Sequence, residues 1–242
     1  MTHTRAHHSL LAAAEKRLLV RIAGRLPSAV TSDHLTLLAL AAMGLAGAGF
    51  ALARVYPATL WLVIAALAIN WFGDSLDGTL ARVRGAERPR YGFYVDHVLD
   101  IVGITLLMGG LAVSGFMTPA IALAVLAAYL LVAGEAFLAT AVRSVFTMSW
   151  AGVGPTELRI VLAVGTLALF GDPHVDLGTL DRVRLFDVGG SIAAAGMLVA
   201  LGVSVARNTL ALARLEPRQL PAPRLSTPRP ASGTARTRAG SA

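Results

Sequence analysis

Long apolar runs without a charged residue are the feature that most constrains how this chain can fold. Four such runs occupy residues 35–53, 55–73, 101–134 and 188–206. A helix of about 20 residues crosses a bilayer, so each run has span length, and the third has room for two spans with a turn near residues 114–119. A shorter run, 160–171, reaches span length if its helix starts near Pro155, since proline is favoured in a first turn. The sequence therefore predicts an all-α integral membrane protein with six transmembrane helices.

The basic residues are unevenly distributed over the predicted loops. With six spans, both termini and the segments 82–91 and 143–159 share one side and hold 18 of the 21 Lys and Arg residues. Cytoplasmic loops carry such an excess, so we expect both termini in the cytoplasm and a location in the cell membrane. The net charge of +7 suggests attraction to anionic lipids rather than nucleic acid, because the basic residues lie at span ends without interleaved aromatic residues. The absence of cysteine excludes disulfides and thiolate metal sites.

The two ends of the chain differ from its centre. Leu11, Leu18, Ile22 and Leu26 follow helical spacing within residues 8–27, which predicts an amphipathic helix in the membrane interface. From Pro217 the chain is rich in Pro, Arg, Ser and Thr, which predicts disorder. We therefore expect an N-terminal segment (1–33), a six-span domain (34–212) and a disordered cytoplasmic tail (213–242), with residues 172–187 as a polar outer loop.

Four aspartates flank one predicted cytoplasmic loop. They lie in Asp74-x-x-Asp77-Gly78-x-x-Ala81-Arg82 and, nine residues later, in Gly92-x-x-x-Asp96-x-x-x-Asp100. Each pair shares a helix face, so two helices can direct four carboxylates at one point. Such carboxylates repel one another unless a positive charge holds them, and oxygen ligands at this density predict a hard divalent cation, Mg²⁺ or Mn²⁺.

Small residues and one arginine accompany these carboxylates. Gly78, Ala81 and Gly92 allow a bulky ligand to approach the backbone, and Arg82 suits phosphate oxygens. This combination predicts a phosphate or pyrophosphate site, in which two cations bridged by carboxylates could assist displacement at phosphorus. A carboxylate left free of metal could act as the base, and spacing alone does not say which one.

This pattern resembles the signature of the class I CDP-alcohol phosphotransferases (CDP-alcohol phosphatidyltransferases), with every signature position present. The resemblance implies a membrane transferase of phospholipid biosynthesis that cleaves a CDP-linked donor, in most bacterial-type members CDP-diacylglycerol. The substituted phosphate passes to an alcohol and CMP is released. By that similarity Asp74, Asp77 and Asp96 ligate two divalent cations, and Asp100 assists one metal and acts as general base.

The resemblance also implies further site residues and a homodimer. Gly78, Ala81 and Arg82 would line the CDP site, together with Gly92. Members often carry Pro-Asn-x-x-Thr before the first span. The matching stretch, Ser32-Asp33-His34-Leu35-Thr36, changes its first two residues and leaves Asp33 and Thr36 as CDP-binding candidates. Gly44, Gly47 and Gly49 permit close helix packing, either between subunits or within one.

The acceptor alcohol is less clearly indicated. Arg143, Arg159 and Arg207 resemble the acceptor-phosphate pocket of members that use phosphorylated alcohols, although ordinary anchoring at span ends is an alternative. Glu135 lies about two turns inside the predicted fourth span, where a charge is costly and tends to be paired or functional. We expect a role in acceptor binding, with Arg143 or Arg159 as its partner.

Two other functions compete with this interpretation. His97 follows Asp96, as in cholinephosphotransferase-like members, which would imply a CDP-amino-alcohol donor and diacylglycerol as acceptor; alternatively, His97 is a packing residue. A cation transporter with an acidic mouth belongs to another class. It requires polar residues deep in several spans, and apart from Glu135 and scattered Asn, Ser and Thr the runs lack them.

Overall fold

The structure of the chain is a computed structural model that describes residues 10–143, 155–178 and 180–216. The elements are α1 (Leu10–Ala23), α2 (Ser32–Ala53), α3 (Thr59–Val83), α4 (Pro89–Ser114), α5 (Pro119–Arg143), α6 (Pro155–Ala168), β1 (His174–Leu177), β2 (Leu180–Arg184) and α7 (Leu185–Leu215). The predicted disordered tail from residue 217, and most of the predicted loop 143–159, lie outside the described residues.

Five helices of the described chain are long and apolar enough to cross a membrane: α2, α3, α4, α5 and α7. The predicted turn between two spans is confirmed, since α4 ends at Ser114, Gly115 adopts φ +80°, and α5 begins at Pro119. The fifth predicted span corresponds to α6, which begins at Pro155 as expected but has 14 residues. The prediction of a helical membrane protein is confirmed, while a count of six spans stays a prediction.

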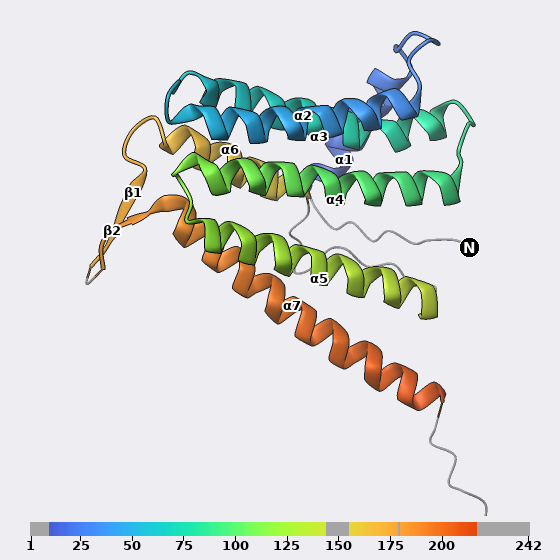
Figure 1. Ribbon diagram of the computed structural model, residues 1–242. Coiled ribbons are helices and arrows are strands. Elements are labelled where there is room, and N and C mark those ends of the chain that lie inside the picture. The colour runs from blue at the N-terminus through green and yellow to red at the C-terminus, as the bar shows by residue number, and fades with distance from the viewer. Residues whose placement is uncertain (1–9, 144–154, 179, 217–242) are drawn as a thin grey trace, which may run out of the picture.

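The helices alternate in direction, so the bundle has two distinct ends (Figure 1). At one, the aspartate end, lie the α3–α4 connection and the C-termini of α5 and α7. At the other, the hairpin end, lie the α2–α3 connection and the antiparallel strands β1 and β2 (Figure 1), which pair His174 with Arg184 and Val175 with Val183. The prediction of residues 172–187 as a loop was therefore wrong. Apolar and polar residues alternate along β1, and Gly178 with φ +66° turns the chain between the two strands.

Helix α2 packs along both α3 and α4. At the α2–α4 crossing, a Cβ atom on Gly110 would lie 2.0 Å from the Gly47 carbonyl oxygen. A Cβ on Gly49 would lie 2.8 Å from the Val63 side chain of α3, whereas one on Gly44 would contact only the Leu106 side chain, at 3.6 Å. Small residues let membrane helices approach closely and gain van der Waals contact. Gly47 and Gly49 therefore pack within the chain, one of the two alternatives predicted for them.

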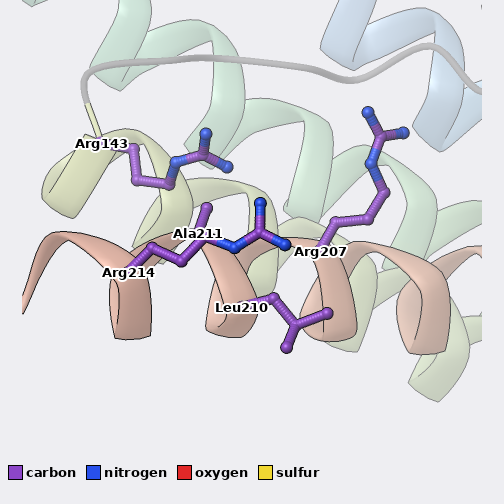
Figure 2. Close-up of a pocket in the computed structure, with 5 residues that line it drawn as sticks. All are labelled: Arg143, Arg207, Leu210, Ala211 and Arg214. Atoms are coloured by element: carbon purple, nitrogen blue, oxygen red, sulfur yellow. The ribbon is translucent and has the colours of Figure 1, made fainter. Parts of the chain in front are cut away.

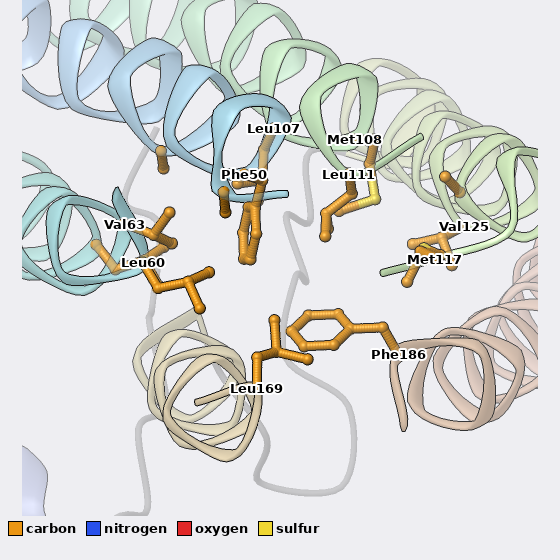
Figure 3. Packing of buried hydrophobic residues seen from close by; sticks show 14 of the residues in the cluster. Phe50, Leu60, Val63, Leu107, Met108, Leu111, Met117, Val125, Leu169 and Phe186 are labelled. Carbon is orange, nitrogen blue, oxygen red and sulfur yellow. The ribbon is translucent and has the colours of Figure 1, made fainter. Parts of the chain in front are cut away.

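The main apolar core lies toward the hairpin end. Figure 3 shows Phe186 of α7 directed between Leu169 and Leu111, with Phe50 of α2 opposite. The rings of Phe50 and Phe186 meet edge to face at 5.7 Å between centroids. Leu60 of α3 belongs to the same cluster. The start of α7 is thus joined to the start of α3 and the ends of α2 and α4.

A second, smaller apolar cluster joins α1 to the aspartate end. Leu19 and Ala23 of α1 are buried against Leu76 and Leu80 of α3. In the segment between α1 and α2, the carbonyl groups of Leu26, Pro27 and Val30 accept hydrogen bonds from the Arg84 guanidinium. The predicted helix within residues 8–27 is present, and part of its apolar face covers α3. Its location in a membrane interface stays a prediction.

Candidate active site

Three of the four predicted aspartates meet at one point. Asp74 of α3 and Asp96 and Asp100 of α4 each offer a carboxylate oxygen, and these oxygens all lie within 4.8 Å of one another. All three residues are half-buried. Because α3 and α4 both rest on α2, their side chains can reach toward a common point. Three carboxylates with room for an ion between them fit a hard divalent cation.

Asp77 is turned toward α2 instead. Its Oδ2 accepts a hydrogen bond from the Thr36 hydroxyl at 2.8 Å, and its Oδ1 accepts one from the Gly78 N–H at 2.5 Å. Its carbonyl oxygen also accepts a hydrogen bond from Ser32 at 2.5 Å. Residues three apart on a helix differ by about 60° in direction, which takes Asp77 away from the other three carboxylates. The structure therefore gathers three of the predicted metal ligands and uses Asp77 to join α2 to α3.

Arg159 forms an ion pair with Asp74, whereas the sequence analysis predicted it to bind the acceptor phosphate. Its Nη2 donates to Asp74 Oδ2 at 2.6 Å and its Nε to Asn70 Oδ1 at 2.7 Å. Asn70 is buried, and its Nδ2 donates to the Ala39 carbonyl oxygen at 3.0 Å. These bonds connect α6, α3 and α2 and fix one carboxylate of the cluster. Sequence reasoning missed Asn70, although it precedes Asp74 by four residues on the same helix face.

The two CDP-binding candidates at the start of α2 contact other helices. The Thr36 hydroxyl donates a hydrogen bond to Asp77, and Asp33 makes an ion pair with Arg88. The Arg88 guanidinium also lies 3.9 Å from the centre of the Tyr91 ring. The hydrogen bond from Arg88 to Asp33 raises the pKa of the guanidinium above its ordinary value. Both candidates thus take part in contacts that connect α2 to α3 or α4.

The remaining CDP-binding candidates lie on α3 and α4, close in sequence to the aspartates. Arg82 donates to the Thr79 hydroxyl at 3.1 Å, and a Cβ on Gly78 would lie 3.4 Å from the Arg82 guanidinium. A Cβ on Gly92 would meet no atom within 4 Å, and Ala81 is half-buried. Gly92 is exposed and Gly78 is half-buried, and the role of these residues in CDP binding stays a prediction.

Three arginines lie together at the C-termini of α5 and α7. Arg143, Arg207, Leu210, Ala211 and Arg214 line a cavity of about 300 Å³. Figure 2 shows the three arginine side chains extending to the same side of α7, while Leu210 points the other way. Arg143 and Arg207 thus come together as predicted, but Arg214 replaces Arg159 as the third arginine. Arg214 follows Arg207 by seven residues, a spacing that returns to the same helix face and could have identified it.

Glu135 and His97 have different surroundings from those predicted. Glu135 accepts hydrogen bonds from Ser204 at 2.8 Å and Asn208 at 2.6 Å, in place of the expected arginine. His97 is buried, its Nδ1 lies 2.6 Å from the Phe93 carbonyl oxygen, and its ring packs on Phe93 at 4.2 Å between centroids. These contacts favour His97 as a packing residue.

The long apolar helices and the gathered carboxylates fit a membrane protein that can hold a divalent cation. The family model of the CDP-alcohol phosphatidyltransferases matches residues 27–212, more than half of the chain, so the chain belongs to this family. It is a family of phosphotransferases that transfer a phosphatidyl group from a CDP-alcohol to an alcohol and that use divalent metal ions. No match was found among curated proteins.

Proposed function

We propose that this enzyme transfers the phosphatidyl group of CDP-diacylglycerol to an alcohol and releases CMP. The observation that carries this proposal is the group of three carboxylates, Asp74, Asp96 and Asp100, within a chain of this family. The nearby residues Gly78, Ala81 and Gly92 are small, and Arg82 would supply a permanent positive charge for the phosphates of the nucleotide. Asp33 and Thr36, at the start of α2, complete the proposed CDP site.

Two Mg²⁺ or Mn²⁺ ions are the proposed cofactors. Asp74, Asp96 and Asp100 would hold them, with Asp77 contributing from the side of Thr36. Bound there, the ions would neutralise the pyrophosphate oxygens of the donor.

Asp100 is the proposed general base. The oxygen of the acceptor hydroxyl attacks the phosphorus that carries diacylglycerol, and Asp100 takes the hydroxyl proton. The bond between that phosphorus and the bridging oxygen of the pyrophosphate breaks, and CMP leaves with the electron pair. The α4 backbone places Asp100 one turn from Asp96, so the base lies next to a proposed metal ligand.

The proposed acceptor is a phosphorylated alcohol. Arg143, Arg207 and Arg214 line a cavity at the aspartate end of the bundle, and three guanidiniums suit the oxygens of a phosphate group (Figure 2). Arg159 is assigned to Asp74 rather than to this cavity because of its hydrogen bonds. The packing of His97 gives no support to a CDP-amino-alcohol donor.

The proposed location is the cell membrane, with the aspartate end and both termini in the cytoplasm. The excess of Lys and Arg on that side supports this orientation. A homodimer is proposed from the family resemblance. Gly47 and Gly49 give it no support, since they pack inside the chain.

An acceptor screen tests the proposed function. Purified protein is supplied with CDP-diacylglycerol, Mg²⁺ or Mn²⁺, and in turn glycerol 3-phosphate, inositol 1-phosphate, serine or diacylglycerol, and released CMP is measured. We expect CMP with a phosphorylated alcohol. CMP release with serine alone would contradict the acceptor assignment. A parallel assay replaces CDP-diacylglycerol with CDP-choline and supplies diacylglycerol; CMP release in that assay alone would contradict the donor assignment.

A further inference from the structure

Glu135 is a carboxylate within a membrane-spanning helix whose hydrogen bonds come from a neighbouring helix. On α7, Ser204 donates to its Oε2 at 2.8 Å and Asn208 to its Oε1 at 2.6 Å. Ser204 and Asn208 are four residues apart and therefore share a helix face. An intramembrane charge is costly, so two charge-assisted hydrogen bonds from one partner helix indicate a specific role.

The side-chain amide of Asn208 connects Glu135 to Arg143. Its NH₂ group donates to Glu135, and its carbonyl oxygen accepts from Arg143 Nη1. A reversed amide would direct its carbonyl at a carboxylate and its NH₂ at a guanidinium, and both contacts would be repulsive. Glu135 thus determines that the acceptor end of the amide faces Arg143.

A neutral group between Glu135 and Arg143 has an electrostatic consequence. A direct ion pair would hold the guanidinium in place but would also offset its charge. In this arrangement Arg143 is held by an uncharged amide oxygen, and it lines the cavity together with Arg207 and Arg214 (Figure 2). Its position is fixed, while its charge stays available to an anion in the cavity.

We propose that Glu135 and Asn208 are positioning residues that hold Arg143 for a phosphorylated acceptor, Glu135 acting only through Asn208. This relay, from Glu135 through Asn208 to Arg143, rests on the proposed acceptor cavity and gives Glu135 an indirect part in acceptor binding. Asn208 was not among the candidates predicted from the sequence. The relay predicts that a substitution at Asn208 changes the KM for the acceptor and leaves the KM for the donor unchanged.

A set of variants at positions 135 and 208 tests the relay. For full-length enzyme with CDP-diacylglycerol and Mn²⁺, we expect Asn208→Leu to raise the KM for glycerol 3-phosphate or inositol 1-phosphate by about 10-fold, equivalent to 1.4 kcal/mol. The KM for CDP-diacylglycerol should change less than about two-fold. Asn208→Asp should be worse, since it places a carboxylate against Glu135.

The double variant Glu135→Gln with Asn208→Asp tests the relay most directly, because it exchanges the carboxylate and the amide. It again gives one carboxylate and one amide, so Arg143 should be held in place and the acceptor KM should fall below that of Asn208→Asp. The KM should stay above the wild-type value, because the carboxylate now beside Arg143 offsets part of its charge. Stabilisation of each variant by inorganic phosphate, measured as a shift in Tm, gives a readout without turnover and should follow the same order. Ser191→Ala, at an exposed position of α7, is the control and should match the wild type.

Two results would overturn the relay: a wild-type acceptor KM in Asn208→Leu, or a double variant no better than Asn208→Asp alone. Arg143→Gln separates this failure from that of the proposed cavity. If Arg143→Gln leaves both acceptor KM and phosphate stabilisation unaltered, the cavity is wrong. If it impairs both while Asn208→Leu impairs neither, only the relay is wrong.

Discussion

The hairpin end and the aspartate end of this bundle differ in the side chains that they contain. Near the hairpin end, large apolar side chains such as Phe50, Leu60 and Leu111 have an exposed fraction of 0–1%. At the aspartate end, half-buried carboxylates and arginines lie beside small residues, and the buried apolar cluster there joins α1 to α3. Packing fixes the helices at one end and leaves polar groups able to receive ligands at the other. Stability and chemistry are therefore expected to respond to substitutions at different ends.

Asp100→Asn is the largest expected effect at the aspartate end. Loss of the proposed base should lower the rate of CMP release by about 10³-fold, or roughly 4 kcal/mol, with Tm within about 1 °C of the wild type. Asp172→Asn is the matched control, because Asp172 is an exposed aspartate at the hairpin end. A wild-type rate in Asp100→Asn would contradict the assignment of the base.

Gly110→Ala tests the close packing of α4 against α2. The new Cβ would lie 2.0 Å from the Gly47 carbonyl oxygen, so α2 and α4 must separate. We expect a loss of stability of about 2 kcal/mol, measured by thermal or denaturant unfolding. Gly109→Ala, whose Cβ would meet no atom within 4 Å, should have little effect. Equal stabilities of the two variants would argue against the close crossing.

Arg159→Gln should affect the metal dependence more than the stability. Removing the guanidinium leaves the Asp74 carboxylate without its 2.6 Å partner and frees it to turn away from Asp96 and Asp100. Residues that orient metal ligands commonly contribute about 10-fold to metal affinity or activity. We therefore expect the Mn²⁺ concentration for half-maximal activity, and Mn²⁺ binding followed by electron paramagnetic resonance, to shift by about 10-fold. Arg182→Gln, at the hairpin end, should leave both unchanged.

Arg84→Gln is the smallest expected effect. It removes hydrogen bonds to the carbonyl groups of Leu26, Pro27 and Val30, which hold the segment between α1 and α2. A net loss of about 1 kcal/mol should lower Tm slightly and make this segment more sensitive to protease. Unaltered proteolysis would show that the apolar contacts of α1 are sufficient.

Periodicity and charge predicted the helical membrane fold because lipid imposes strong rules on length and charge. The i, i+4 spacing correctly brought Asp96 and Asp100 together. Spacing within one helix could not show where Asp77 points, because that depends on how α2 lies against α3. Arg159 was assigned to the wrong partner for a similar reason: its contact with Asp74 spans 85 residues of sequence.

Local sequence spacing could have identified two further site residues and the two strands. Arg214 and Asn70 each lie on the same helix face as a predicted site residue, at spacings of seven and four. The strands β1 and β2 were missed because a polar segment after an apolar run was interpreted as a loop, although Val175 and Leu177 alternate with polar neighbours.

Metal-dependent CMP release is the most direct measurement of the central claim that the three aspartates form the site of phosphatidyl transfer. Protein stripped with a chelator is given CDP-diacylglycerol and an acceptor, and CMP is followed before and after addition of Mg²⁺ or Mn²⁺. We expect no CMP release before the metal is added and full recovery after it in the wild type, with no recovery in Asp96→Asn. Release by the stripped protein at the wild-type rate, or full recovery in Asp96→Asn, would contradict this claim.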